Sequence, residues 1–334
     1  MHHRSMTPEE VDVKLGIDGG QGSLKVTLSL TLKPEETEAS PCKKRCKYSE
    51  GYGQGDNFKD SSVHKAIILA LVPTMNESHV NLRILLEKLG LGSLEYSHSE
   101  DIKVMLQILG KQPASSTHPC PFCETSKPNL EKADPNTLSS LISWHEKWLK
   151  DGGNPGKLKF FQNVMHPHLL TGEPSTKVIE LFNIPGLHIL LGVVDKLLSE
   201  MEKNLFQSRE EGFAFFNSYL KSINLSRVSY QGQHRIEGNG CNQFLKNIDK
   251  LEVCFKAVNL ALSGAKYIKV FRDFSKVVHG CFGKTVSPTF REDIHQFSLS
   301  YRDVGATVTV KVHILEQHVI EFIEMKGGVL GKTI

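Results

Sequence analysis

Hydrophobic and polar residues alternate with a period of two at the start of the chain. Apolar side chains fall on one face over residues 11–17 and again over residues 24–32. This period is typical of strands that bury one face. The turn between the two stretches, residues 18–23, is rich in glycine, so the sequence predicts an antiparallel hairpin.

Apolar runs further along predict another strand, a helix and then shorter elements. Residues 64–73 form a continuous apolar run, which is typical of a central strand buried on both faces. Asn76 can cap a helix whose leucines share one face, and Gly90 can end it. The remaining predicted elements are a strand at 94–100, a helix at 102–109 and a strand at 114–118.

This order of elements predicts an α+β fold. Because the opening hairpin is antiparallel, the sheet is expected to be mixed, which argues against a doubly wound architecture. The order resembles that of the ribonuclease H-like fold. In that fold the first strand lies beside the strand that follows the first helix, so Asp18 and Asp101 would lie near each other.

A polar segment separates the hairpin from the third predicted strand. Residues 33–63 contain prolines, glycines and a basic run at 43–47. A solvated loop explains this composition, and a phosphate-contacting loop or a nuclear-import patch are the alternatives. We interpret Cys42 and Cys46 as loop thiols, because no second pair of ligands stands out for them.

The middle and the end of the chain are predicted to be helical. Pro135 begins a helix that runs through Trp148, and a glycine-rich break follows at 152–156. Residues 187–201 form a strongly apolar helix, in which we expect His188 to be a hydrogen-bonded core residue rather than a ligand. Further helical patterns cover residues 210–223, 242–262, 267–278, 291–301 and 309–325.

Length, charge and cysteine content narrow the class of protein. The 334 residues suffice for one large domain or two ordinary ones, and the net charge of +3 neither requires nor excludes a nucleic-acid partner. Seven cysteines, an odd number, argue for a reducing compartment rather than a disulfide framework. The sequence has neither an apolar run of membrane-spanning length nor a signal peptide, so we expect a soluble intracellular protein with no membrane partner.

Two pairs of residues that lie far apart in the sequence form a candidate metal site. Cys120 and Cys123, in a C-x-x-C turn, offer two thiolates, and His313 and His318 offer two imidazoles from a predicted helix. Two cysteines and two histidines are a common ligand set of tetrahedral structural zinc. Each pair also has another explanation, since the cysteines could be a redox motif or two unrelated buried thiols and the histidines could be surface residues.

Asp18 and Asp101 form a second candidate site. Two neighbouring carboxylates can hold Mg²⁺ ions, which clamp the attacking and leaving oxygens of a phosphodiester displacement. Each aspartate also has a structural explanation. Asp18 precedes Gly19 in a hairpin turn, and Asp101 lies at a strand-to-helix junction, where aspartate is a good N-cap.

The ordered set of these motifs resembles Transib-type transposases. It is also similar to the catalytic core of the recombination-activating (V(D)J) recombinase. The resemblance covers residues 11–334 as scattered short motifs. The positions that carry it are 18–23 with Lys25, then Asp101, Cys120 and Cys123, and His313 and His318; Leu187-His188 with Gly192 and Gly238-Asn239 with Lys246 look like further landmarks.

This resemblance implies a DDE-type core in which a ribonuclease H-like domain is interrupted by a helical zinc-binding insertion. We expect the ribonuclease H-like part at 1–119, the insertion at 120–325 and the start of a truncated C-terminal segment at 326–334. The resemblance implies a nuclear protein that acts on double-stranded DNA, as a homodimer. The implied metal ligands are Cys120, Cys123, His313 and His318 for structural Zn²⁺, and Asp18 and Asp101 for catalytic Mg²⁺ or Mn²⁺.

The main departure from the family is the third carboxylate. In the family it is a glutamate on a helix that would follow Ile334, whereas Glu321 and Glu324 lie on the wrong helix. We therefore expect a transposase or recombinase core, either a fragment or a domesticated remnant, with little or no DNA cleavage of its own. The alternatives are a non-catalytic zinc-braced module that binds DNA or protein, and a zinc protein with no link to DNA.

Overall fold

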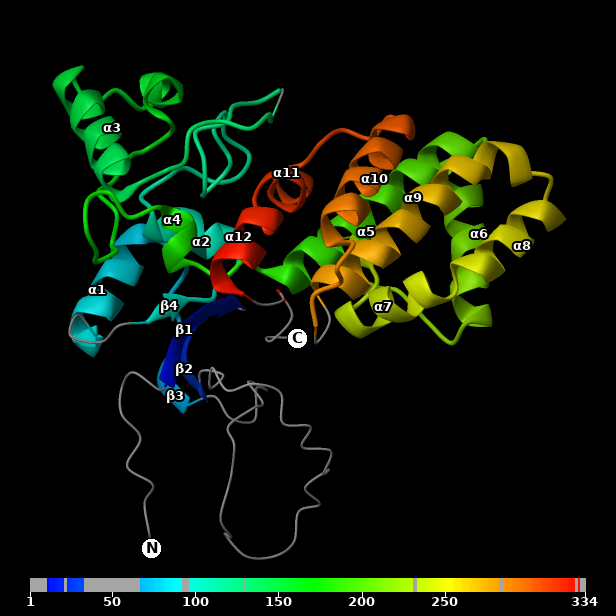
Figure 1. The fold of residues 1–334 in the computed structure, drawn as a ribbon, viewed down its shortest axis with the longest axis horizontal. Helices are drawn as coiled ribbons and strands as arrows, with labels where there is room; N and C mark the ends of the chain where they lie inside the picture. Colours follow the sequence, from blue (N-terminus) through cyan, green and yellow to red (C-terminus); the bar gives the residue numbers. More distant parts are fainter. Residues whose placement is uncertain are drawn as a thin grey trace, which may run out of the picture.

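The computed structural model describes residues 11–20, 23–32, 67–91, 96–128, 130–230, 233–282, 285–327 and 330. Within them the chain is α+β, with a four-stranded mixed sheet followed by a largely helical region (Figure 1). The α+β prediction is confirmed at this level. The predicted loop at 33–63, with its basic run and its two thiols, lies outside the described residues.

The sheet has the strand order β3-β2-β1-β4. β1 (Val11–Gly20) and β2 (Ser23–Leu32) form the predicted hairpin, and β3 (Ile67–Val72) pairs with β2, also antiparallel. β4 (Ser97–His98) lies on the other side of β1 and runs parallel to it. The hairpin buries one face, as its alternation predicts, through Leu15, Ile17, Leu24 and Val26.

The prediction that β3 is a central strand, buried on both faces, is wrong. Ile68 and Leu71 are 59% and 66% exposed. The physical reason is strand order, because β3 lies at the edge of the sheet and only β2 pairs with it among the described residues. A continuous apolar run therefore indicated a strand but not its place in the sheet.

Two helices pack on the buried face of the hairpin. α1 (His79–Leu89) and α2 (Ile102–Ile108) contribute leucine and methionine side chains to the same core cluster as β1 and β2. Ser78, rather than the predicted Asn76, caps α1, because its hydroxyl accepts the N–H of Asn81. Gly90 ends α1 as predicted, with a left-handed φ of 62°.

The strand predicted at 114–118 is absent from this region, which consists of turns and bends. The N–H of Ser116 donates to the carbonyl of Pro113, and the N–H of Lys127 donates to that of Thr117. These local bonds take the place of a strand ladder. The prediction was wrong because residues 114–117 are small and offer little apolar surface to bury in a sheet.

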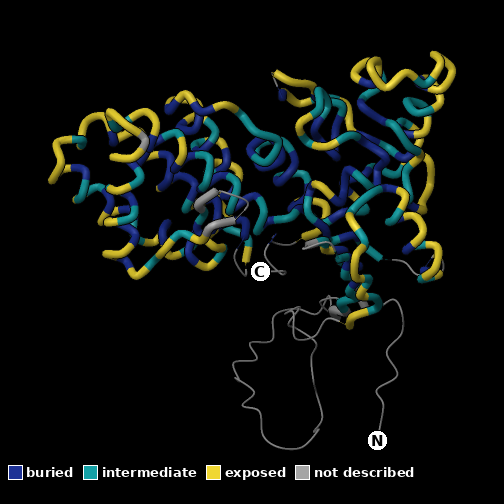
Figure 2. The backbone as a smooth tube through the Cα atoms, turned by 180° about the vertical axis from the view of Figure 1, so that it is seen from behind, coloured by how far each residue is buried: buried dark blue, intermediate teal, exposed yellow. Residues whose placement is uncertain are grey.

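The rest of the described chain is mainly helical, and α5 lies at its centre. α5 packs against α6, α7, α9 and α11, and Figure 2 shows that buried positions lie along the inner side of this bundle. No helix among the described residues is long and apolar enough to cross a membrane. The elements after α2 are α3 (Leu138–Lys150), η4 (Pro155–Phe161), α4 (Val178–Leu181), α5 (Gly186–Leu205), α6 (Arg209–Ser222), β5 (Val228–Tyr230), β6 (Gln233–Arg235), α7 (Gly238–Lys246), α8 (Ile248–Ala257), α9 (Ala261–Cys281), α10 (Phe290–Asp303), α11 (Val310–Gln317) and α12 (Val319–Lys326).

Two of the predicted helices are divided. The helix predicted at 242–262 is broken at Asn247, between α7 and α8, and again near Asn259, whose φ is 58°. The helix predicted at 309–325 is broken at His318, which separates α11 from α12. Asparagine tolerates the left-handed region better than most residues do, so the break at 259 has a local cause. The hairpin β5–β6 was not predicted.

Candidate metal centre and aspartate pair

Four side chains from distant parts of the sequence meet at one buried point. Their ligating atoms, two sulfurs and two ring nitrogens, all lie within 4.8 Å of one another, and the residues are at most 5% exposed. They are Cys120, Cys123, His313 and His318, the set expected from the sequence. Among the described residues this is the one group of three or more such side chains close enough to hold a metal.

The spacing of these atoms fits a tetrahedral metal such as zinc. Cys120 Sγ lies 3.5 Å from His318 Nε2, Cys123 Sγ lies 3.3 Å from His313 Nε2, and the two Nε2 atoms are 3.3 Å apart. A tetrahedron with Zn–S of about 2.3 Å and Zn–N of about 2.0–2.1 Å separates sulfur from nitrogen by about 3.6 Å and the nitrogens by about 3.3 Å. The donor set and its geometry could therefore hold zinc.

The break between α11 and α12 brings the two histidines together. Residues five apart on a continuous helix point about 140° apart around its axis, which would turn one imidazole away from the other. His318 instead has φ −121° and ψ −21°, outside helical geometry, and it lies where α11 ends and α12 begins. Thr309 caps the start of α11 by accepting the N–H of Val312, which fixes the turn that carries His313.

Hydrogen bonds behind the ligands hold them in place. His313 Nδ1 donates to the carbonyl of Leu130 at 2.7 Å, which leaves its Nε2 as the ligand atom. The buried amide of Asn136 donates to the carbonyls of Pro121 and Cys123, at 2.8 and 3.2 Å, and so fixes the C-x-x-C turn. The sequence analysis missed Leu130 and Asn136, because neither residue type marks a metal site without its position in space.

The two thiols differ in acidity. Burial raises the pKa of Cys120, whereas the pKa of Cys123 is lowered, first by its hydrogen bond with Cys120 and then by those with His313 and His318. Because metals bind cysteine as thiolate, binding of a divalent metal would release any proton that remains on the two sulfurs. The buried ammonium of Lys111 donates to the carbonyl of Cys120 at 3.2 Å, so a positive charge lies beside these sulfurs.

The two aspartates lie at the same end of neighbouring parallel strands. Leu15 of β1 pairs with His98 of β4, and the N–H of Ser99 donates to the carbonyl of Leu15 at 2.8 Å. Asp18 and Asp101 each follow the paired residue by three positions. The side chain of Asp101 caps α2 by accepting the N–H of Val104 at 2.8 Å, so its structural explanation holds, and its second oxygen is not used by the cap.

His188, at the start of α5, lies within electrostatic range of both aspartates. Burial lowers the pKa of His188; Asp101 and Asp18 oppose this change, and Lys311 adds to it. His188 is half-buried and has no hydrogen-bond partner among the described residues, which differs from the hydrogen-bonded core position that we expected. Lys311, two residues before a zinc-ligand candidate, was not singled out in the sequence.

Three other carboxylates, Glu321, Glu324 and Glu77, are engaged elsewhere. Glu321 pairs with Lys177 at 3.2 Å, and Glu324 accepts Arg291 Nε at 3.0 Å, so both are explained as helix charges. The side chain of Glu77 lies over Gly19 and pairs with Lys103. Gly19 and Asp18 are adjacent in β1 and so face opposite sides of the sheet. Glu77 therefore lies on the side of the sheet away from the Asp18 side chain.

The two further landmarks of the helical region are in contact. A Cβ added at Gly238, the first residue of α7, would lie 2.6 Å from Leu187 Cδ1 of α5. Gly238 therefore allows the start of α7 to approach the start of α5 closely. Lys246 is exposed at the far end of α7.

No protein-family model matches this chain, and no curated protein matches it in sequence. The function must therefore be argued from the two sites themselves.

Proposed function

We propose that this chain is the core of a DDE-type DNA transposase or recombinase of the Transib-like kind, which nicks DNA and transfers strands in a metal-dependent reaction. The observation that carries the proposal is the parallel register of β1 and β4, in which Asp18 and Asp101 follow the paired residues Leu15 and His98 by the same number of positions. The strand order β3-β2-β1-β4, with α1 before β4 and α2 after it, supports the proposal, because it agrees with the order expected for a ribonuclease H-like sheet.

The chemistry assigned to the aspartates follows from their charge and position. In this proposal Asp18 and Asp101 hold Mg²⁺ through carboxylate oxygens, and the cation supplies positive charge to the oxygens of an in-line phosphodiester displacement. The N-cap bond of Asp101 fixes that side chain, so one oxygen faces the backbone and the other is left for the cation. Cys120, Cys123, His313 and His318 hold structural zinc, which ties α11 to the turn after α2.

The described residues supply two of the three acids that the family uses. No third carboxylate joins Asp18 and Asp101 in the described part of the chain. Transfer of a phosphoryl group depends on metal charge and on positioning, so the 334-residue polypeptide should bind cation and DNA but turn over little or not at all. Double-stranded DNA as substrate, a homodimer and a nuclear location belong to the same proposal.

DNA binding with and without a divalent cation tests this function. Ca²⁺ replaces Mg²⁺ in the assay, because it binds carboxylates without supporting turnover. We expect Ca²⁺ to tighten binding of a labelled DNA duplex to the wild-type protein, and Asp18→Asn and Asp101→Asn to remove this gain. Asn also caps helices, so Asp101→Asn should preserve α2. Asp303→Asn, at the exposed end of α10, is the matched control.

Two outcomes would contradict the proposal. A Ca²⁺ effect that is unchanged in Asp18→Asn would remove the aspartates from the cation site. Mg²⁺-dependent nicking of plasmid DNA by the wild type, lost in Asp18→Ala, would retain the site but refute the expected lack of turnover.

The second candidate is a non-catalytic zinc-braced module that binds DNA or protein. It is favoured by one observation, that the metal-ligand set of two cysteines and two histidines is complete among the described residues while the aspartate pair has no third acid. DNA binding that depends strongly on salt but is unaffected by Asp18→Ala and Asp101→Ala would favour this function.

A further inference from the structure

A lysine on α11, the helix that carries His313, lies within electrostatic range of Asp101. Lys311 is in the first turn of α11, two residues before His313. Its side chain lies across α5 at Gly192, where an added Cβ would be 2.6 Å from Lys311 Nζ and closer still to Cδ. Only a glycine leaves room for the lysine at this position, since any larger residue would displace it.

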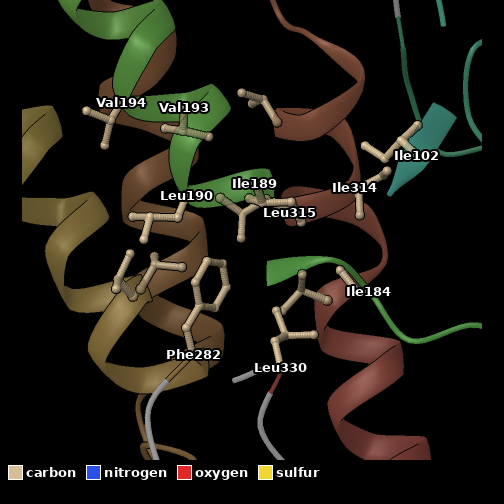
Figure 3. Packing of buried hydrophobic residues seen from close by; sticks show 14 of the residues in the cluster. Ile102, Ile184, Ile189, Leu190, Val193, Val194, Phe282, Ile314, Leu315 and Leu330 are labelled. Carbon is tan, nitrogen blue, oxygen red and sulfur yellow. The ribbon is translucent and has the colours of Figure 1, made fainter. Parts of the chain in front are cut away.

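Two observations relate this lysine to the aspartates. His188 lies one helical turn before Gly192, on the same side of α5, and it is the residue whose charge environment includes both Asp18 and Asp101. Figure 3 shows Ile102, the residue after Asp101, next to Ile314, one turn along α11 from Lys311. α2, α5 and α11 are therefore neighbours, and His188 of α5 lies within electrostatic range of Asp18, near the end of β1.

We propose that Lys311 binds a phosphate of the DNA backbone at the Asp18–Asp101 site, and that Gly192 exists to let it reach that position. The inference rests on the proposed function, because it takes the aspartates as the cation site. A cation held by two carboxylates and an ammonium beside it would contact different oxygens of the same phosphodiester. Lysine is a common phosphate ligand that acts as a point charge.

The alternative role for Lys311 is an ordinary ion pair on the surface of α5. Asp195, one turn beyond Gly192, lies within electrostatic range of Lys311, as Asp101 does, but Arg235 pairs with Asp195 at 3.5 Å. No salt bridge or hydrogen bond joins Lys311 to another of the described residues, and its side chain is half-buried. A half-buried ammonium that has no hydrogen-bond or salt-bridge partner is costly to desolvate, and an anionic ligand bound beside it would offset that cost. This favours a role for Lys311 in ligand binding over a structural ion pair.

The same geometry gives the zinc centre a role in substrate binding. His313 is held in the metal cluster and Lys311 lies half a turn earlier on the same short helix. Anything that releases His313 would allow the first turn of α11 to move, and Lys311 with it. Zinc would thus position a phosphate ligand as well as brace the fold.

The test measures binding of a short labelled DNA duplex over a salt series, without added divalent cation and with Ca²⁺. Lys311→Gln should weaken binding about tenfold in both conditions and reduce the salt slope by about 0.9, the effect of one lost phosphate contact. Lys311→Arg should retain most of the affinity. Lys203→Gln, an exposed lysine at the other end of α5, is the control and should change neither quantity.

Gly192→Ala provides a second, independent variant that keeps every charge. Its new methyl group would push the flexible lysine side chain aside rather than meet backbone. Because alanine favours a helix more than glycine does, the melting temperature should be unchanged or higher. We expect the loss of DNA affinity to match that of Lys311→Gln, with zinc content unchanged, so misfolding cannot account for it.

The outcomes separate this inference from the proposed function. If Lys311→Gln or Gly192→Ala binds DNA with wild-type affinity and salt slope while Asp18→Asn loses the Ca²⁺ effect, the lysine assignment is wrong and the cation site stands. If the wild type shows no DNA binding at low salt, both are wrong. If both variants lose affinity equally while Lys203→Gln does not, the assignment is supported.

Discussion

Removal of one metal ligand, by Cys123→Ala, should destabilise the whole described fold rather than one turn. The metal would connect Cys123 to His313, which are 190 residues apart in the sequence. Treated as a cross-link, closure of a loop of this length lowers the entropy of the unfolded chain by an amount worth about 5 kcal/mol at 25 °C. Native proteins are stable by about 5–15 kcal/mol, so this loss is a large part of the total.

Urea denaturation and a zinc assay measure this effect. Purified wild-type protein should contain zinc in a one-to-one ratio, released on denaturation and measured with a chelating dye, whereas Cys123→Ala should contain none. With an unfolding slope of about 3 kcal/mol per molar urea, the loss should move the midpoint down by about 1.5–2 M. EDTA should move the wild-type midpoint in the same direction and leave that of the variant unchanged.

Cys254→Ala is the matched control, because Cys254 is a half-buried thiol outside the cluster. It should retain zinc and the wild-type response to EDTA. Zinc bound in full by Cys123→Ala, or a wild-type urea midpoint that EDTA does not change, would refute the metal cross-link.

Three more predictions follow from single residues. Asn136→Ala leaves carbonyls of the C-x-x-C turn without their donor, so zinc competition assays should show affinity lower by about 10–100-fold, and unchanged affinity would count against this support. Gly110 has a φ of +70°, and Gly110→Ala would place a Cβ 2.6 Å from the carbonyl carbon of His166. Urea denaturation should therefore show a free energy of unfolding lower by at least about 3 kcal/mol. A smaller decrease would mean that the backbone can relax there. Burial raises the pKa of Glu100, so ionisation of this carboxyl lowers the free energy of unfolding as pH rises through the folded pKa. Glu100→Gln should therefore increase the free energy of unfolding at neutral pH, but not below the ordinary glutamate pKa of about 4.3. A variant that is less stable than the wild type at neutral pH would contradict this.

The local pattern of the sequence determined most of the elements that carry the two sites. The alternation over residues 11–32 predicted the hairpin, and Asp101 at the start of a helical pattern predicted the cap of α2. These features depend on neighbouring residues only, so their period and their capping residues suffice to predict them. Ligand identity was also local, since cysteine and histidine offer the donor atoms that zinc prefers.

The tertiary structure decided the order of the strands in the sheet and the place where the C-terminal helix breaks. The apolar run of β3 did not reveal that it lies at an edge, because strand order depends on contacts across the sheet. The pattern of residues 309–325 did not reveal the break at His318, because the tertiary contacts of the side chains decide whether the helix continues there.

The sites themselves show the same division. The sequence supplied two cysteines and two histidines, but their meeting depends on chain segments up to 198 residues apart. Lys311 and Gly192 have no recognisable motif in the sequence, and only the packing of α11 on α5 brings them together. Hydrophobic period and capping are set within a few residues, whereas a binding site is set by which distant surfaces pack together.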